Sequence, residues 1–429
     1  MSDIISKTGL ITDSILLEGE TSEILKLIDS RRHESTHPIL VSGLSEGARA
    51  VFYAAVIRKV REKYKIPALI IVSDEKEGLR IFNALSELSL KPLSYPLRDF
   101  VFHNIVSSRE YEHERLKALS AFVTTDSPYD CVIATPDAAM QYTMPIAFLK
   151  EGTLTIDRDE KCDLSKLVSY LEANGYVRSD MVDGVGQYSV RGGIIDIYPP
   201  YAENPVRIEL FDDEIDQMGL FDIMTQRKIE NIAKVTITPA RELVLGEGKR
   251  AEIRAAVKAQ IPKAKDDRVR GELSAELETI DGGLELPFID KYMSIVYPEH
   301  TTLADYASYA AVMSDLKYPL VFVQESVACT ERMKAYDFHI GSEIESLLEN
   351  GEVSAKYSDY SRHEDTYGTF LDKNGALLIN AFVSGVSGMK LAGMFGFHTK
   401  QTVSYADNTE LLIEDLTSYA AGKFRTVLL

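Results

Sequence analysis

Short apolar runs alternate with helical segments along much of this chain, and this alternation constrains the fold more than any other feature. The runs at 39–41 and 68–72 are each followed by a segment with helical periodicity. A third run, at 130–134, is again followed by a helical stretch. Strands that alternate with helices are typical of a parallel sheet covered by helices. We therefore expect a doubly wound α/β domain.

The pattern changes after residue 154. The segment Leu164–Asn174 predicts a helix that ends at Gly175, since glycine is the usual residue just beyond a helix C-terminus. The stretch 186–222 carries the densest strand signal of the chain, with apolar residues at every second position over 206–210. These elements predict a small α+β insert.

The α/β pattern returns downstream, with strands expected at 292–296 and 320–323 and helices at 303–312 and 342–348. The α/β domain should therefore be discontinuous, with the insert between its halves. The chain ends inside an apolar run at 424–429, so we expect the last domain to be truncated. The expected division is 1–128 for the first half, 129–213 for the insert, 214–349 for the second half, and 350–429 for a linker and a partial α/β domain.

Composition limits the classes of function. The 429 residues carry a net charge of −19, which argues against tight non-specific DNA binding by the chain as a whole, because phosphate binding needs a cationic surface. There is no apolar run of about 18 residues and no signal-peptide core, so we expect no membrane span and a cytoplasmic location. The cysteines lie too far apart for metal-ligand spacing and are expected to be reduced thiols: Cys131, Cys162 and Cys329.

Catalytic motifs are absent from the sequence. The eight histidines show no metal-ligand spacing, and no hydrolase elbow is present. The acidic cluster Asp212–Glu214 falls where a hairpin turn is expected, so solvated turn charges explain it better than a metal site. We expect neither catalytic residues nor a metal centre.

The loop after the first strand has the place of a phosphate-binding loop but not its chemistry. A Walker A motif, G-x-x-x-x-G-K-[ST], uses backbone N–H groups and a lysine to hold phosphates and a hydroxyl to hold Mg²⁺. Aligned on Gly43, its last three positions are Ala48, Arg49 and Ala50. The alanines supply neither the close backbone approach nor a metal ligand, and arginine is longer and planar. We expect a degenerate P-loop (RecA-like) domain without nucleotide turnover.

Five blocks within residues 175–245 carry a family resemblance: GYVRSD, GQYSVRGGIIDIYP, PVRIELFDDEI, FDIMTQRKIENI and VTITPARELVL. In order and spacing they resemble the excision-repair protein UvrB, and more closely the N-terminal part of the bacterial transcription-repair coupling factors (Mfd). The degenerate loop separates the chain from UvrB, which keeps its ATP site. The segment after 68–72 also separates the chain from UvrB, because it is too short for the aromatic hairpin with which UvrB clamps DNA.

The resemblance implies a module that binds UvrA, the damage-recognition protein, through arginines of the insert. By position these are Arg178 and Arg191, with Tyr198 as an apolar anchor. A further arginine of UvrB is replaced here by Ser189. Arg and Tyr are common interface anchors. The alternative for Arg191 is an ion pair inside the insert, with Asp180 or Asp196.

The resemblance also sets the expectations for cofactors and other partners. It implies no cofactor for this chain, with ATP and Mg²⁺ used only by the motor domains of a longer parent. RNA polymerase and DNA would be contacted by those missing domains, and a C-terminal domain could mask the UvrA-facing surface in an autoinhibitory contact. The alternative function is a UvrB-related, ATP-dependent DNA repair enzyme of the helicase type. The discriminating feature is the loop that runs from Gly43 to Ala50.

Overall fold

A seven-stranded parallel sheet forms the centre of the computed structural model, which describes residues 9, 11–30, 37–100, 110–246, 248–383, 389–400, 405 and 408–423. Its five inner strands are almost continuously apolar and buried, as expected for strands covered on both faces. Their order is β17 (Gly393–Gly396), β1 (Ile39–Ser42), β16 (Leu377–Asn380), β15 (Val321–Gln324), β2 (Ala68–Ile71), β4 (Cys131–Ala134) and β3 (Pro92–Tyr95).

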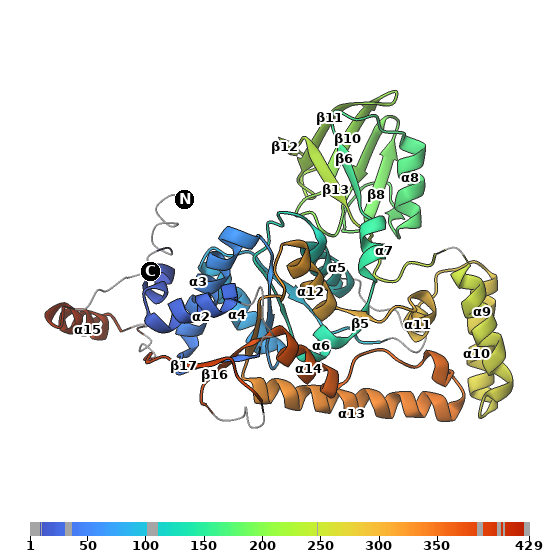
Figure 1. Ribbon diagram of the computed structural model, residues 1–429. Coiled ribbons are helices and arrows are strands. Elements are labelled where there is room, and N and C mark those ends of the chain that lie inside the picture. The colour runs from blue at the N-terminus through green and yellow to red at the C-terminus, as the bar shows by residue number, and fades with distance from the viewer. Residues whose placement is uncertain are drawn as a thin grey trace.

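Helices cover both faces of this sheet (Figure 1). The direction of each right-handed crossover decides the face. One face carries α3 (Glu46–Tyr64) and α4 (Glu75–Glu87); the other carries α5 (Glu110–Val123), α12 (Leu303–Met313), α13 (Ser326–Asn350) and α14 (Glu364–Asn374). The expected doubly wound α/β domain is confirmed, and strands from before and after residues 154–240 share its sheet.

The insert forms the upper lobe in Figure 1 and has its own core. Its sheet order is β12 (Lys228–Asn231), β11 (Glu214–Phe221), β10 (Val206–Phe211), β9 (Ile194–Ile197), β8 (Gln187–Arg191) and β7 (Val177–Arg178). One face packs on α8 (Leu164–Ala173) and on the two-stranded antiparallel sheet of β6 (Leu154–Asp157) and β13 (Lys234–Ile237). We call the opposite face the open face.

The remaining elements lie around these two bodies. They are α2 (Gly19–Ser30), α6 (Pro136–Met140), β5 (Tyr142–Thr143), α7 (Ile146–Glu151), α9 (Lys249–Gln260), η1 (Ile261–Lys263), α10 (Asp267–Asp281), η2 (Ile289–Tyr292), α11 (Met293–Val296), β14 (Thr301–Thr302), η3 (Ala355–Tyr357) and α15 (Thr409–Ala421). Helix α15 has no buried residue and stands away from the central body in Figure 1.

The domain boundaries differ from the sequence-based division. Strand β4 belongs to the large sheet, so the insert begins near residue 154 and not at 129. Strands β11 and β12 pair within the insert, which therefore extends past 213 to about residue 240. Strands β16 and β17 flank β1 in the large sheet, although they fall in the expected linker and partial domain 350–429. Pairing between strands far apart in the sequence, which local patterns do not reveal, causes the differences at β4, β16 and β17.

Two local expectations are also corrected. The segment 292–296 is helical and not a strand, because its apolar residues are buried within a single turn, α11. Strand β17 was not expected at all, since its sequence GMFG has a glycine at each end and no alternation. The apolar run at 424–429 lies outside the described residues.

A buried ion-pair network closes the discontinuous domain where the chain returns from the insert. Glu242 is fully buried and accepts two hydrogen bonds from Arg115 of α5, both at 2.9 Å. Thr143 donates to the same carboxylate at 2.6 Å. Arg98 lies 3.4 Å from Glu242 and pairs with Asp290 at 2.6 Å. Burial alone would raise the pKa of Glu242, but the two arginines hold it below the ordinary 4.5.

We expect Glu242→Gln to lower the free energy of unfolding by about 3–5 kcal/mol, because Arg115 and Arg98 then stay buried with one counter-charge fewer. Urea unfolding at neutral pH measures the loss. Because the pKa is depressed, the ionised carboxylate stabilises the fold above the unfolded-state pKa, and this contribution disappears as pH falls through the folded-state pKa.

The gap in stability between wild type and Glu242→Gln should therefore narrow in acid. Glu230→Gln, on the exposed strand β12, is the matched control and should change stability by less than about 0.5 kcal/mol. A gap that is the same at neutral and acid pH would contradict the assignment of the charge to Glu242.

Candidate functional site

The open face of the insert is organised by one buried carboxylate. Asp196 of β9 is 1% exposed and lies between two arginines. Arg207 of β10, its cross-strand neighbour, binds it with two hydrogen bonds, at 2.7 and 2.8 Å. Arg191, at the end of β8, donates to Oδ2 at 2.7 Å. Of the two alternatives for Arg191, the ion pair with Asp196 is the one that forms.

The two arginines differ in exposure and therefore in what they can do. Arg207 stacks its guanidinium on Phe221 at 4.7 Å, and its hydrogen bond to Asp196 raises its pKa. It is a structural partner of the carboxylate. The Arg191 side chain is 51% exposed although it is paired. One edge of its guanidinium is held by Asp196, and other N–H groups remain accessible for an acceptor on another molecule.

Half of the open face is covered by the chain itself. The loop 179–186 leads from β7 to the start of β8 and passes over this face. Ser189 donates to the backbone carbonyl of Asp180 at 2.9 Å, and Val182 is fully buried. Gln226, in the turn between β11 and β12, donates to the carbonyl of Val182 at 3.3 Å. The half next to the central domain is therefore closed to a partner.

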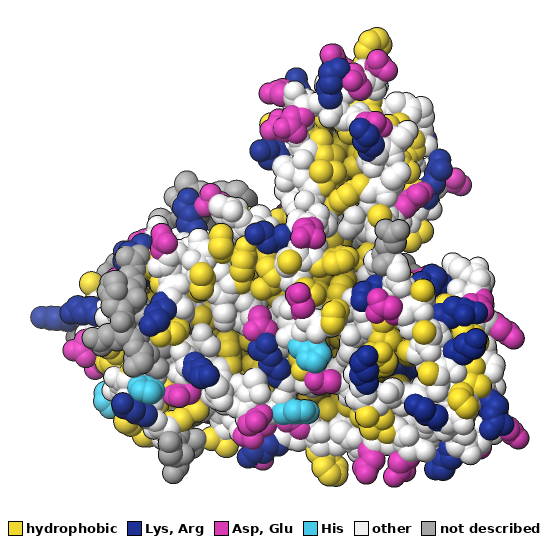
Figure 2. Space-filling view, turned by 45° about the vertical axis from the view of Figure 1, so that its right-hand side comes forward, with side chains coloured by type: hydrophobic (Ala, Val, Ile, Leu, Met, Phe, Trp, Pro, Cys, Tyr) yellow, Lys and Arg dark blue, Asp and Glu magenta, His cyan; other side chains and the backbone are white. Residues whose placement is uncertain are grey.

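The other half, which we call the distal half, stays uncovered. Strand alternation places Arg191, Ile194, Glu209 and Phe211 on it, because their neighbours Val190, Ile195, Ile208 and Leu210 belong to the core on the other face. Figure 2 shows hydrophobic side chains among charged ones on this lobe. The distal half combines an accessible guanidinium with an exposed aromatic ring.

The three residues expected to form one partner site lie in three places. Arg178 pairs in register with Tyr188, so its side chain leaves the sheet on the α8 side, at the exposed edge strand β7. Tyr198 follows β9 at the end near the central domain and is only half-buried. Its hydroxyl donates to the carbonyl of Glu203 at 3.0 Å. Of the three, Arg191 alone lies on the distal half.

Tyr198 therefore belongs to a turn that docks the insert on the central domain. Tyr201 of the same turn packs its ring on Tyr129 at 5.7 Å, and its hydroxyl lies 3.3 Å from that of Ser127. This position favours a structural role for Tyr198 over the expected role as an apolar anchor.

A later segment of the same chain packs against the degenerate nucleotide loop. Gly43 has φ +77°, and a Cβ there would collide with the carbonyl oxygen of Phe397. The backbone N–H of Ser45 donates to the hydroxyl of Thr399 at 2.6 Å, and that hydroxyl donates to the carbonyl of Gly43 at 3.0 Å. In a working P-loop, such backbone N–H groups bind phosphate oxygens. Here Thr399 takes up the N–H of Ser45.

The position of the catalytic lysine is also neutralised. Arg49 pairs with Glu325 at 2.5 Å, and its side chain is only 12% exposed. Glu325 follows β15 and also accepts the backbone N–H of Ala381 at 3.0 Å. Ala48 is half-buried, and Ala50 is buried. Ala48 lines a cavity of about 360 Å³ together with Glu18 and Glu20. The carboxylates of these two residues would repel a phosphate. The loop has anion-binding backbone without an anion-binding environment.

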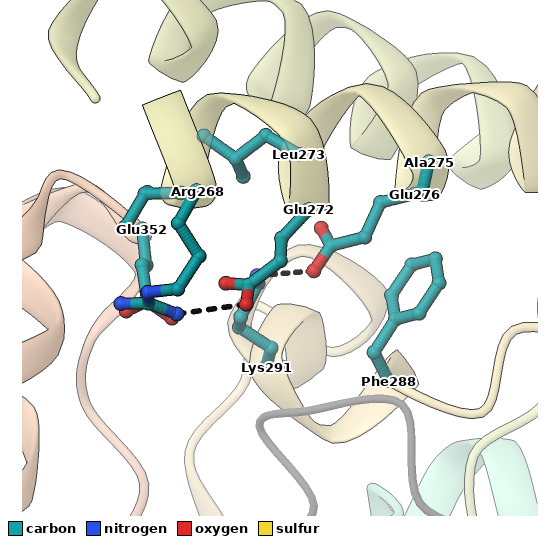
Figure 3. A pocket seen from close by; sticks show the side chains of 9 residues that line it. Arg268, Glu272, Leu273, Ala275, Glu276, Phe288, Lys291 and Glu352 are labelled. Atoms are coloured by element: carbon teal, nitrogen blue, oxygen red, sulfur yellow. Dashed lines mark hydrogen bonds and ion pairs between the residues drawn. The ribbon is translucent and has the colours of Figure 1, made fainter. Parts of the chain in front are cut away.

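Another cavity, of about 420 Å³, lies under α10 and offers no free charge to a ligand (Figure 3). Lys291 is paired with Glu276 at 2.5 Å, and Arg268 with Glu272 at 2.7 Å. In the described ranges, no three His, Cys, Asp or Glu side chains converge so that they could hold a metal ion. No helix among the described residues is long and apolar enough to cross a bilayer.

Sequence reasoning missed the residues that complete both sites. Glu325 and Thr399 lie 276 and 354 positions from the loop residues that they contact, so no local pattern indicates them. Arg207 was not predicted although a signal exists: it and Asp196 carry opposite charges, and each stands between two core residues at matching positions of adjacent strands. Phe211 lies beside the hairpin turn, and a single apolar residue at such a position does not by itself indicate a binding site.

Comparisons with known proteins show which families the sequence of this chain is similar to. Residues 154–243, the insert, match the family model of the UvrB interaction domain. A transcription-repair-coupling factor of Bacillus subtilis is 31% identical over 306 residues, which cover 68% of this chain and 25% of that protein. That of Staphylococcus haemolyticus is 27% identical over 415 residues, covering 91% and 33%. That of Staphylococcus aureus strain MRSA252 is 25% identical over 402 residues, again covering 91% and 33%.

The chain thus spans a quarter to a third of the length of these relatives. The interaction-domain match falls on the lobe with its own core, and the longer matches extend over most of the chain. The chain belongs with the N-terminal, UvrB-like module of the transcription-repair-coupling factors.

Proposed function

We propose that this chain is a non-catalytic binding module that recruits UvrA to stalled transcription complexes. The observation that carries the proposal is the distal half of the open face: in a UvrB interaction domain it presents a held but accessible Arg191. Arginine binds carboxylates in paired hydrogen bonds and is a frequent interface hot spot. Arg178, exposed on edge strand β7, would contribute from the side of the same lobe.

The other partners belong to the proposal as well. Contacts with RNA polymerase and DNA, and the use of ATP and Mg²⁺, are proposed for parts of the relatives that this chain does not match. A contact of such a part with the distal half would mask Arg191 until transcription stalls. The setting proposed for all of these steps is the cytoplasm.

The alternative, an ATP-dependent helicase-type enzyme, has less support. Thr399 and Phe397 occupy the surroundings of the glycine loop, and Glu325 neutralises Arg49. Phosphate would have to displace a hydrogen bond and an ion pair at once. A module that only binds a partner protein requires neither the hydrogen bond nor the ion pair at the loop to be displaced.

We expect Arg191→Ala to weaken UvrA binding about tenfold or more, because truncated interface arginines often cost this much. The variant should fold, since Asp196 keeps both hydrogen bonds from Arg207. Titration of this chain with the cognate UvrA measures the affinity, and Arg178→Ala is expected to weaken it in the same direction.

Arg227→Ala is the matched control, because Arg227 is an exposed arginine of the same lobe in the turn that precedes β12. Its affinity should equal that of the wild type. Equal affinities for the wild type and the Arg178→Ala/Arg191→Ala double variant would show that the partner site is elsewhere. Absence of binding by the wild type would remove the proposal itself.

We expect no ATP hydrolysis by this chain, because the phosphate-binding positions are already occupied by its own residues. Addition of Mg-ATP should leave the unfolding midpoint unchanged, since a ligand that does not bind cannot stabilise the folded state. Phosphate release and thermal unfolding test both statements. Hydrolysis that Arg49→Ala abolishes would instead support the helicase-type alternative.

A further inference from the structure

Phe211 is an aromatic side chain that the fold of this chain does not use. It ends β10 at the tip of the β10–β11 hairpin and is 79% exposed. Its neighbour Leu210 points to the core on the other face, so the alternation of the strand leaves Phe211 on the open face. An exposed phenyl ring contributes little to folding, and an aromatic ring is a frequent anchor in protein interfaces.

The position of Phe211 connects it to the proposed partner site. Arg191 pairs with Ile194, which pairs with Glu209, two residues before Phe211. The Cα atoms of Arg191 and Phe211 are therefore about two strand spacings apart across the sheet and two residues apart along it, roughly 12 Å in all, and both residues lie on the same face. A single partner surface can meet both.

The fold fixes the guanidinium of Arg191 and the backbone that carries Phe211. The carboxylate of Asp196 holds Arg191 at 2.7 Å, and Arg207 holds the carboxylate in turn. The hairpin that carries Phe211 is fixed by the backbone N–H of Leu210, which donates to the carbonyl of Gly193 at 2.8 Å. Groups that are already ordered lose less conformational freedom when they bind. The distal half is thus prepared for contact before any partner arrives.

We propose that Phe211 is the apolar anchor of the surface that faces UvrA. It inserts into an apolar recess of the partner while Arg191 meets a partner carboxylate beside it. This inference rests on the proposed function and deepens it. It assigns the role expected for Tyr198 to a residue on the distal half, where Arg191 lies.

The test is titration of the full chain with UvrA, comparing Phe211→Ala with Met224→Ala. Met224 is the matched control: it is 87% exposed in the same lobe, in the turn between β11 and β12, away from the distal hairpin. We expect Phe211→Ala to weaken binding about tenfold or more and Met224→Ala to leave it unchanged. Phe211→Tyr, which keeps the ring, should retain most of the affinity.

Thermal unfolding of each free variant accompanies the titration, and the midpoint should not move, because Phe211 is exposed in the free chain. If wild type and Phe211→Ala bind UvrA equally, Phe211 is not the anchor, although the proposed function stands. Equal losses in Phe211→Ala and Met224→Ala would also overturn the anchor, since they indicate a general effect of surface hydrophobicity. If the wild type does not bind UvrA, both the proposed function and the anchor fail.

Discussion

The buried pairing of Glu242 with Arg115 and Arg98 is the interaction on which the rest of the structure depends. The two arginines precede the insert in the chain and the glutamate follows it, so the network joins the segments that enter and leave that lobe. Charges removed from water are costly unless each lies close to an opposite charge. The geometry at Glu242 therefore favours one arrangement of these segments over alternatives that separate them.

The ion-pair network at Glu242 helps to fix the position of the insert on the central domain. Next to Glu242, Arg241 pairs with Glu112 of α5 at 3.1 Å, and on the insert side Tyr201 packs on Tyr129. The end of the lobe near the central domain is occupied by these contacts. Among the described residues, no hydrogen bond or ion pair joins Arg191 or Phe211, at the far end of the lobe, to the central domain. A lobe fixed at one end and exposed at the other is suited to present a surface to a second protein.

Much of the fold follows from local patterns, and most of the site does not. The buried runs that became β1, β2 and β4 predicted the parallel sheet, because a strand covered on both faces is apolar throughout. Glycine-rich β17 has no such signature and was missed. The sequence limits the possible ion-pair partners of Arg191 to two carboxylates. Only the strand register shows that the partner is Asp196. Arg49 and Glu325 meet across 276 residues, beyond the reach of any local pattern.

The glycine loop and the insert differ in how their polar groups are paired. At the loop, the N–H of Ser45 donates to Thr399, and the guanidinium of Arg49 is paired with Glu325 of the same chain. A ligand there would have to replace internal bonds, with little net gain. On the distal half of the open face, Arg191 is held through one edge only, so a new acceptor adds bonds without breaking any. This difference supports the proposal that a partner binds at the lobe and not at the loop, although the loop is the site that the parallel-sheet architecture would lead one to expect.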